Sequence, residues 1–224
     1  MTDVILTTLP VMLGAALAPI WIILVVLLLR DPNGLTKGIA FVAGATTVRL
    51  GQGIMFGYLF AAFSPAEETQ DFSVVVSTLL IVGGILLLIV TLKAFRQTSD
   101  PDAPPLRWMV VMDSANALTV FGLGAVLTLA ATKFWVLTLL AISIICEADL
   151  NRLESITAFL IYVLGTEVLI LIPLVVYAIV PRQSAALLRS IAHWLEQYDH
   201  PITIAVSFTF GSLFLWQGVM GFMA

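Results

Sequence analysis

Six long stretches of apolar residues alternate with short polar segments along the chain. Each stretch has about 20 residues or more, the length that an α-helix needs to cross the hydrocarbon core of a bilayer. The stretches cover residues 4–29, 38–63, 73–92, 117–146, 155–180 and 202–223. The pattern therefore predicts an all-α membrane protein with six transmembrane helices.

Two prolines and one overlong stretch indicate irregular helices inside the membrane. Pro19 and Pro173 each lie in the middle of an apolar stretch. A proline removes one backbone donor and frees a carbonyl one turn back, so each marks either a broken helix or a simple kink. The fourth stretch exceeds the roughly 20 residues needed to span. A break near Thr132 and Lys133 would mirror one at Pro19.

A polar, proline-rich segment divides the chain into two halves of three spans. Residues 1–97 form the first predicted three-helix repeat, 98–116 a cytoplasmic linker with an interfacial segment, and 117–224 the second repeat. An odd number of spans per half gives the halves opposite orientations, as in the inverted repeats of many transporters. The segments 13–17 and 123–127 are similar and occupy similar places in the two halves.

Two further matches follow in the same order. Ile20-Trp21 corresponds to Phe134-Trp135, and Gly44 in the second span corresponds to Gly165 in the fifth. The common order of these matches favours 3+3 inverted repeats.

Residues 182–200 have the pattern of an amphipathic helix rather than the continuous apolar run of a membrane span. The apolar side chains of this segment share one face of a helix, and the polar ones take the other. The apolar set is Leu187, Ile191, Trp194, Leu195 and Tyr198. The segment predicts an amphipathic helix in the membrane interface before the last span. The alternative is a packing helix with an aromatic anchor.

Basic residues in the loops predict the orientation of the chain, because cytoplasmic loops carry an excess of Lys and Arg. The loops after the first, third and fifth spans hold Arg30, Lys37, Lys93, Arg96, Arg107, Arg182 and Arg189. The opposite side holds only Arg152. Both termini are therefore expected outside. The first span is expected to be retained, because Met1-Thr2-Asp3 lacks the positive charge of a signal peptide.

The composition excludes several classes of protein. Hydrophobic residues make up 60% of the chain, charged residues only 11%, and the mean hydropathy is +1.08. Soluble domains have about 25% charged residues. A net charge of −4 argues against a nucleic-acid partner. With one cysteine, Cys146, and two histidines outside the spans, we expect no disulfide, metal or cofactor.

Three charged residues lie inside the predicted spans: Arg49, Lys133 and Glu167. Each costs roughly 2.5–3.5 kcal/mol at the bilayer centre, so they are expected to face the bundle interior. One interpretation is a structural Arg49–Glu167 pair with Lys133 as a packing group. The other is a substrate or ion pathway, formed by Pro19, Thr46, Arg49, Gln52, Thr132, Lys133, Thr166, Glu167 and Pro173.

The chemistry of these residues favours transport over catalysis. Glu167 is the one carboxylate in the spans and hence the candidate for proton coupling, while two cations and one anion favour an anionic substrate group. A lone carboxylate has no acid–base partner, so we expect no catalytic residues. No P-loop is present, which leaves secondary transport or a partner-driven process.

Glycines indicate closely packed helices. Gly53 and Gly57 form a GxxxG pair, and Gly83-Gly84 and Gly122-Leu123-Gly124 add small faces. They are compatible with packing inside one chain and with a homodimer.

Several short motifs together resemble the GAP/Sap family, the peptidoglycolipid- or sulfolipid-addressing proteins, within the lysine-exporter (LysE) superfamily. The motifs are Leu13-Gly14-Ala15-Ala16 with Ala18-Pro19, Pro105-Leu106-Arg107-Trp108-Met109 through Asp113, Phe121-Gly122-Leu123-Gly124, Ala131-Thr132-Lys133-Phe134, Ile172-Pro173-Leu174-Val175-Val176-Tyr177, residues 187–195, and Gly211 with Gly218. Thr132 replaces the proline that relatives have in Asn-Pro-Lys. Arg49 and Glu167 are not part of the family pattern.

The resemblance implies export of small amphiphiles or envelope lipids across a bacterial cytoplasmic membrane. The wider superfamily exports amino acids and ions with the proton-motive force, which gives one alternative. A non-transporting scaffold of an envelope-lipid pathway is another.

Overall fold

The computed structural model describes residues 1–63, 69–96, 115–148 and 150–223, and the secondary structure in these ranges is helical. The helices are α1 (Thr2–Ala16), α2 (Pro19–Leu28), α3 (Gly34–Phe63), α4 (Thr69–Arg96), α6 (Ala117–Ala130), α7 (Thr132–Glu147), α8 (Arg152–Ile179) and α9 (Pro181–Met223). The predicted all-α class is confirmed. Most of the predicted linker, residues 98–114, lies outside the described residues.

Four of these helices are each long and apolar enough to cross a membrane within the described residues. Two bent pairs, α1 with α2 and α6 with α7, also pass this test when each pair is taken as one span. The candidate spans therefore number four, or up to six with the bent pairs, and six is the number that the apolar stretches predict.

The first break separates α1 from α2 and bends the chain by 57° at Leu17 and Ala18. In a continuous helix the Trp21 N–H would donate to the Leu17 carbonyl. Here it donates to the Ala18 carbonyl instead, at 3.0 Å. Pro19 has no N–H to lose and is the first residue of α2, a position that suits its fixed φ. Of the two alternatives at Pro19, a broken helix and a simple kink, the structure has the broken helix.

The second break separates α6 from α7, with a bend of 72° at Ala131. Ala131 takes an extended conformation, with φ −82° and ψ 92°, without any proline nearby. The break frees the Leu129 carbonyl, which accepts a hydrogen bond of 2.8 Å from the Trp135 indole Nε1. The predicted break at Thr132 and Lys133 therefore lies one to two residues earlier in the chain.

Pro173 and Pro201 do not break the helices in which they lie. Pro173 lies inside the continuous helix α8, which makes it the kink rather than the break of the two alternatives. Residues 182–200 are helical as predicted, but they form the first part of α9, which continues through Pro201 into the last span. A separate interfacial helix is therefore not present, because one proline removes a single hydrogen bond and the neighbouring turns hold the helix together.

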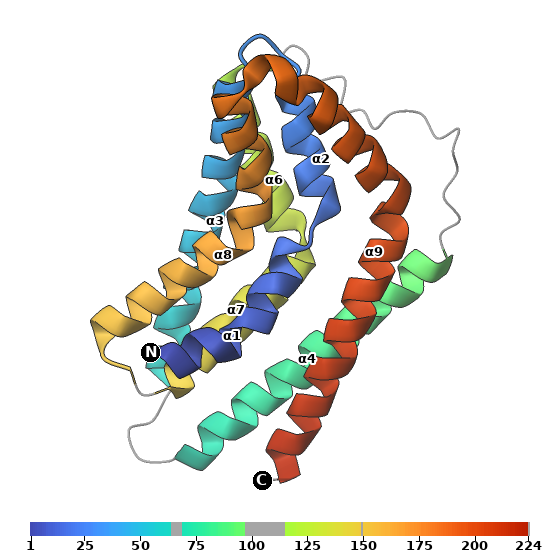
Figure 1. The fold of residues 1–224 in the computed structure, drawn as a ribbon. Helices are drawn as coiled ribbons and strands as arrows, with labels where there is room; N and C mark the ends of the chain where they lie inside the picture. Colours follow the sequence, from blue (N-terminus) through green and yellow to red (C-terminus); the bar gives the residue numbers. More distant parts are fainter. Residues whose placement is uncertain (64–68, 97–114, 149, 224) are drawn as a thin grey trace.

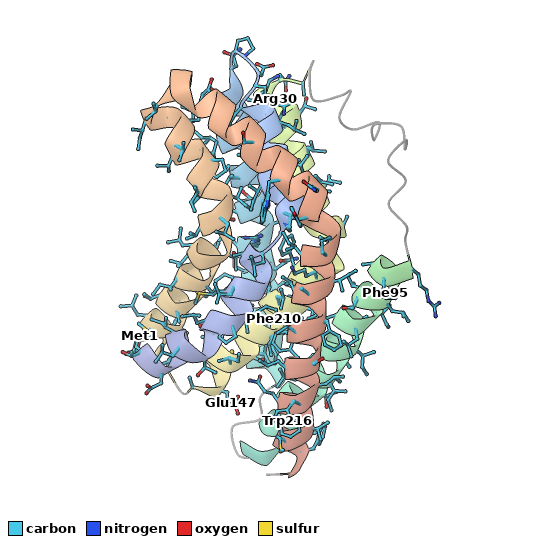
Figure 2. All side chains as sticks on the ribbon, turned by 45° about the vertical axis from the view of Figure 1, so that its right-hand side comes forward. Met1, Arg30, Phe95, Glu147, Phe210 and Trp216 are labelled. Carbon is cyan, nitrogen blue, oxygen red and sulfur yellow. The ribbon has the colours of Figure 1, made fainter. Side chains whose placement is uncertain are left out.

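The helices pack as three long pairs: α4 along α9, α3 along α6, and α1 along α8. Figure 1 shows α4 and α9 beside the remaining helices, with both termini toward the same end of the bundle. Large apolar side chains cover the outside of the bundle (Figure 2), among them Ile54, Leu118 and Trp216. Charged side chains such as Arg49 and Glu167 are buried instead. This distribution suits a surface in contact with lipid.

The turn between α2 and α3 is held by one acidic side chain. Asp31 accepts hydrogen bonds from Lys37 Nζ at 2.7 Å and from the Asn33 backbone N–H at 2.9 Å. The hydrogen bond from Lys37, followed by that from Asn33, lowers the pKa of Asp31. The stability that this ion pair contributes is therefore fully present above the ordinary pKa of a carboxyl and is lost as the pH falls through the lowered pKa of Asp31.

Glycines allow close helix crossings within the chain. A methyl group built at Gly44 of α3 would overlap the Phe121 carbonyl of α6, and one at Gly124 of α6 would overlap the Phe41 carbonyl of α3. Gly84 of α4 and Gly211 of α9 meet in the same way. These glycines serve packing inside one chain, whereas Gly57 and Gly122 have open space beside them.

We predict that Gly124→Ala lowers the stability of the folded chain by about 1–3 kcal/mol, because the new methyl group would meet backbone that cannot rotate away. Gly122→Ala on the same helix is the matched control and should leave stability unchanged or slightly higher. Thermal unfolding of both variants in a neutral detergent measures the difference. Equal unfolding temperatures would show that α3 and α6 do not cross at Gly124.

Candidate functional site

Four of the predicted site residues meet between α3 and α8. Glu167 on α8 accepts a hydrogen bond from the Thr46 hydroxyl, which lies 2.8 and 2.9 Å from its two carboxylate oxygens. Arg49, one turn further along α3, places Nη1 3.5 Å from Glu167 Oε1 and also donates to the Thr166 hydroxyl. Arg49 is 1% exposed and Glu167 3%. The predicted Arg49–Glu167 pair is therefore formed in the structure, in the bundle interior.

Two aromatic rings join this pair to the helix breaks. The Arg49 guanidinium carbon lies 4.6 Å from the centre of the Phe134 ring, within the range of a cation–π contact. Trp21 meets the same Phe134 ring edge to face, with ring centres 5.0 Å apart. Trp21 is in the first turn of α2 and Phe134 in the first turn of α7. The starts of both half-helices therefore lie beside Arg49.

Lys133 connects the two breaks directly. Its Nζ donates a hydrogen bond of 3.0 Å to the Leu17 carbonyl, the group that the first break leaves without its usual helical donor. An ammonium group in this position satisfies a backbone acceptor that would otherwise be costly in an apolar environment. Lys133, in the first turn of α7, thus lies against the first break at Leu17, two residues before Pro19 in the chain.

Several buried polar atoms have no protein partner among the residues that the structure describes. They are Arg49 Nη2, Trp21 Nε1, and both Nε2 and Oε1 of Gln52. Gln52 lies three residues after Arg49 on α3, so the two side chains share a face of the helix. Buried polar groups are normally hydrogen-bonded, and exceptions are concentrated at functional sites. The interior of the bundle therefore has unused hydrogen-bonding capacity next to its charges.

The remaining predicted residues fall outside this cluster. Thr132 is the first residue of α7, at the break, and nothing is described of its side chain. Pro173 is buried in α8 and forms no part of the contacts around Glu167. The sequence interpretation missed Trp21 and Phe134 as site residues. The signal that could have found them is an aromatic residue shortly after each break.

A second, buried polar contact lies nearby on α7 and α8. The hydroxyls of Thr138 and Tyr162 are 3.4 Å apart, and both side chains are buried. Neither residue was among the predicted site residues, because a single threonine or tyrosine in an apolar stretch gives no pattern.

An apolar groove of about 370 Å³ runs between α3 and α8. Its lining residues are Ile39, Val42, Ala43, Thr46, Thr47, Leu171 and Leu174. Thr46 both lines the groove and donates to Glu167, so its hydroxyl connects the groove to the charged pair. Ile39 is more than half exposed, so the groove opens on the outer, apolar surface of the bundle.

Long apolar helices, an apolar exterior and the burial of Arg49 and Glu167 within the candidate spans define a multi-span membrane protein. The described residues contain no group of three or more His, Cys, Asp or Glu side chains arranged to hold a metal ion.

The comparisons add the family. The model of the family described as Sap, sulfolipid-1-addressing protein, matches residues 9–220. The chain belongs to this family, which is linked to sulfolipid addressing. The predicted family is confirmed. Searches of curated proteins and of solved structures give no match.

We predict that Arg49→Met destabilises the protein more than Glu167→Gln does. Removing Arg49 leaves a buried carboxylate without its counter-charge, which costs about 3–5 kcal/mol. The double variant should lose less than the sum of the two single losses, by at least about 0.5 kcal/mol. Thermal or chemical unfolding in detergent measures the three values.

The control for the charge removal is Glu154→Gln, on the same helix. Glu154 belongs to an exposed capping box with Asn151, where glutamine is an equivalent partner. This variant should unfold like the parent protein. Strictly additive losses for Arg49 and Glu167 would mean that the two side chains do not interact.

Proposed function

We propose that this protein is a secondary exporter of small amphiphilic, envelope-lipid-type molecules in a bacterial cytoplasmic membrane. The main observation behind this proposal is the buried Arg49–Glu167 pair, which Thr46 connects to an apolar groove that opens on the outer surface. An amphiphile needs both environments: apolar surface for its chain and polar groups for its head. The family link to sulfolipid addressing supports the same class of substrate.

Alternating access between two inverted repeats is the mechanism that we propose. The packing of the second span of each predicted repeat supports this mechanism. In the first repeat this span is α3, which lies along α6 of the second repeat; in the second repeat it is α8, which lies along α1 of the first. The corresponding glycines lie at these two contacts: Gly44 of α3 meets Phe121 of α6, and Gly165 of α8 meets Met12 of α1. The two helix breaks also fall in corresponding helices. Movement of one repeat against the other would expose a site between them to each side in turn.

Glu167 is the group that we propose for proton coupling. Its carboxylate is held by Thr46 and by Arg49. A substrate anion that binds Arg49 competes with Glu167 for the guanidinium, and a carboxylate that loses its counter-charge in a buried place binds a proton more readily. Substrate binding and protonation of Glu167 would then be coupled, so substrate flux would depend on the proton gradient.

The excess of basic residues in three loops supports a membrane orientation with both termini outside. The loops that carry Arg30 and Lys37, Lys93 and Arg96, and Arg182 and Arg189 would then face the cytoplasm. Export in this orientation starts from the side of the membrane that holds the Asp31–Lys37 turn.

We predict that purified protein in proteoliposomes moves a fluorescent sulfated or phosphorylated amphiphile when a pH gradient is imposed. Glu167→Gln should abolish the stimulation by the gradient, since glutamine cannot exchange a proton. Flux measured with and without the gradient gives the ratio, and Glu154→Gln is the control. Gradient-stimulated flux that survives in Glu167→Gln would exclude Glu167 as the coupling group. If the parent protein shows no flux but retains a partner in mild detergent, a non-transporting scaffold is the better description.

The groove gives a second prediction about the same function. Ala43→Trp fills the groove with an indole and should reduce flux of long-chain amphiphiles by about tenfold or more, because the apolar contact area is lost. The matched control is Ala205→Trp, at an exposed position on α9, a helix that does not line the groove. Equal flux of the two variants would show that the chain of the substrate does not use this groove.

A further inference from the structure

Two helix N-termini meet inside the bundle without capping side chains. The residues before α2 and α7 are Ala18 and Ala131, and neither supplies a side-chain hydrogen bond to the first turn that follows it. The first turns touch through Trp21 and Phe134, whose ring centres are 5.0 Å apart. The N-terminal end of a helix carries roughly half a positive charge and free backbone donors, which together attract anions.

Side chains around this junction add donors that the protein itself does not use. Arg49 reaches the first turn of α7, at 4.6 Å from the Phe134 ring, and its Nη1 is occupied by Thr166 and Glu167. Its Nη2 has no partner among the described residues, and neither has the indole Nε1 of Trp21. The Arg49 and Trp21 side chains are 1% and 8% exposed. Both therefore present an unused N–H next to the same ring.

The charge balance at the junction is positive. Arg49 and Lys133 carry two positive charges, and Glu167 carries the one negative charge that the structure places in contact with Arg49. Lys133 lies in the first turn of α7, and its amine donates a hydrogen bond to the Leu17 carbonyl at the first break. This hydrogen bond links the two breaks. Gln52, one turn from Arg49, adds an unpartnered amide that can donate from Nε2.

We propose that the junction of the two helix starts, with Trp21, Arg49 and Lys133 as its side chains, binds an oxyanion. The side chains come from three helices, α2, α3 and α7, and meet around the Phe134 ring and the first break. A tetrahedral group with several acceptor oxygens can accept from donors in different directions, whereas a halide has no directional acceptors. This proposal deepens the proposed export function and rests on it for one point, that the oxyanion is the sulfate or phosphate ester of an amphiphile's headgroup.

The test uses the full chain in a neutral detergent and measures its unfolding temperature. Sodium sulfate and sodium phosphate are titrated against sodium chloride at constant ionic strength. Trp21→Phe keeps an aromatic ring against Phe134 and removes the indole N–H together with the rest of the five-membered ring; the Trp135→Phe control removes the same atoms. Because a hydrogen bond to a charged group contributes a substantial share of binding, we expect the apparent Kd for sulfate to rise by about tenfold or more.

The matched control is Trp135→Phe, because the Trp135 indole already donates to the Leu129 carbonyl. This variant should bind sulfate like the parent protein. Lys133→Gln, which removes a charge from the junction, is the second variant and should also weaken sulfate binding by about tenfold. If Trp21→Phe and Lys133→Gln both bind sulfate as tightly as Trp135→Phe, or if neither sulfate nor phosphate stabilises the parent protein, the oxyanion site is wrong.

A lipid arm distinguishes the headgroup from the free ion. Sulfatide and galactosylceramide differ only in the sulfate ester, and each is added in mixed micelles to the parent protein and to Trp21→Phe. Stabilisation by sulfatide alone, reduced in Trp21→Phe, supports the headgroup assignment. Stabilisation by inorganic sulfate without any by sulfatide would overturn it in favour of a free anion. Because binding is measured without flux, a protein that binds sulfatide but exports nothing would contradict the export proposal and leave the site intact.

Discussion

Every polar group inside a bilayer needs a partner within the protein, and the Arg49–Glu167 contact is where this requirement is most demanding. Both side chains are buried in an otherwise apolar bundle. Thr46 and Thr166 complete the hydrogen bonds of the pair from α3 and α8. The packing of these two helices therefore determines whether the charges can remain inside, and the apolar exterior can be kept because the charges remain there.

The backbone carbonyls at the helix breaks also need hydrogen-bond partners inside the protein. Each break releases a carbonyl, and each carbonyl finds a side-chain donor from α7: Lys133 for Leu17 and the Trp135 indole for Leu129. The donors differ because the first carbonyl belongs to the other half of the chain, which a long lysine can reach, whereas the second lies within a few residues of Trp135. One short segment at the start of α7 thus stabilises both irregular regions and leaves Arg49 and Trp21 with unused N–H groups.

The sequence could predict what depends on length, polarity and charge. The apolar stretches, the break at Pro19 and the burial of Arg49 and Glu167 all follow from the cost of polar groups in lipid. It could not predict that Pro173 and Pro201 are tolerated inside helices, since that depends on the surrounding turns. The sequence does contain an aromatic residue shortly after each break, but it could not show that Trp21 and Phe134 meet, because the two helix starts are over a hundred residues apart in the chain.

Because α9 continues through Pro201, its length affects how the protein is positioned in the membrane. At 1.5 Å per residue, its 43 residues extend for about 65 Å, and a bilayer with its headgroups is about 40–45 Å thick. Along the membrane normal, roughly 20–25 Å of this length exceeds the whole bilayer, so α9 either extends beyond the headgroups or tilts. The same helix contacts α2 and α4 in the first half of the chain and α8 in the second. Any change in bilayer thickness that tilts α9 is consequently transmitted to both halves at once, so the depth of the bundle in the membrane is a property of the whole molecule.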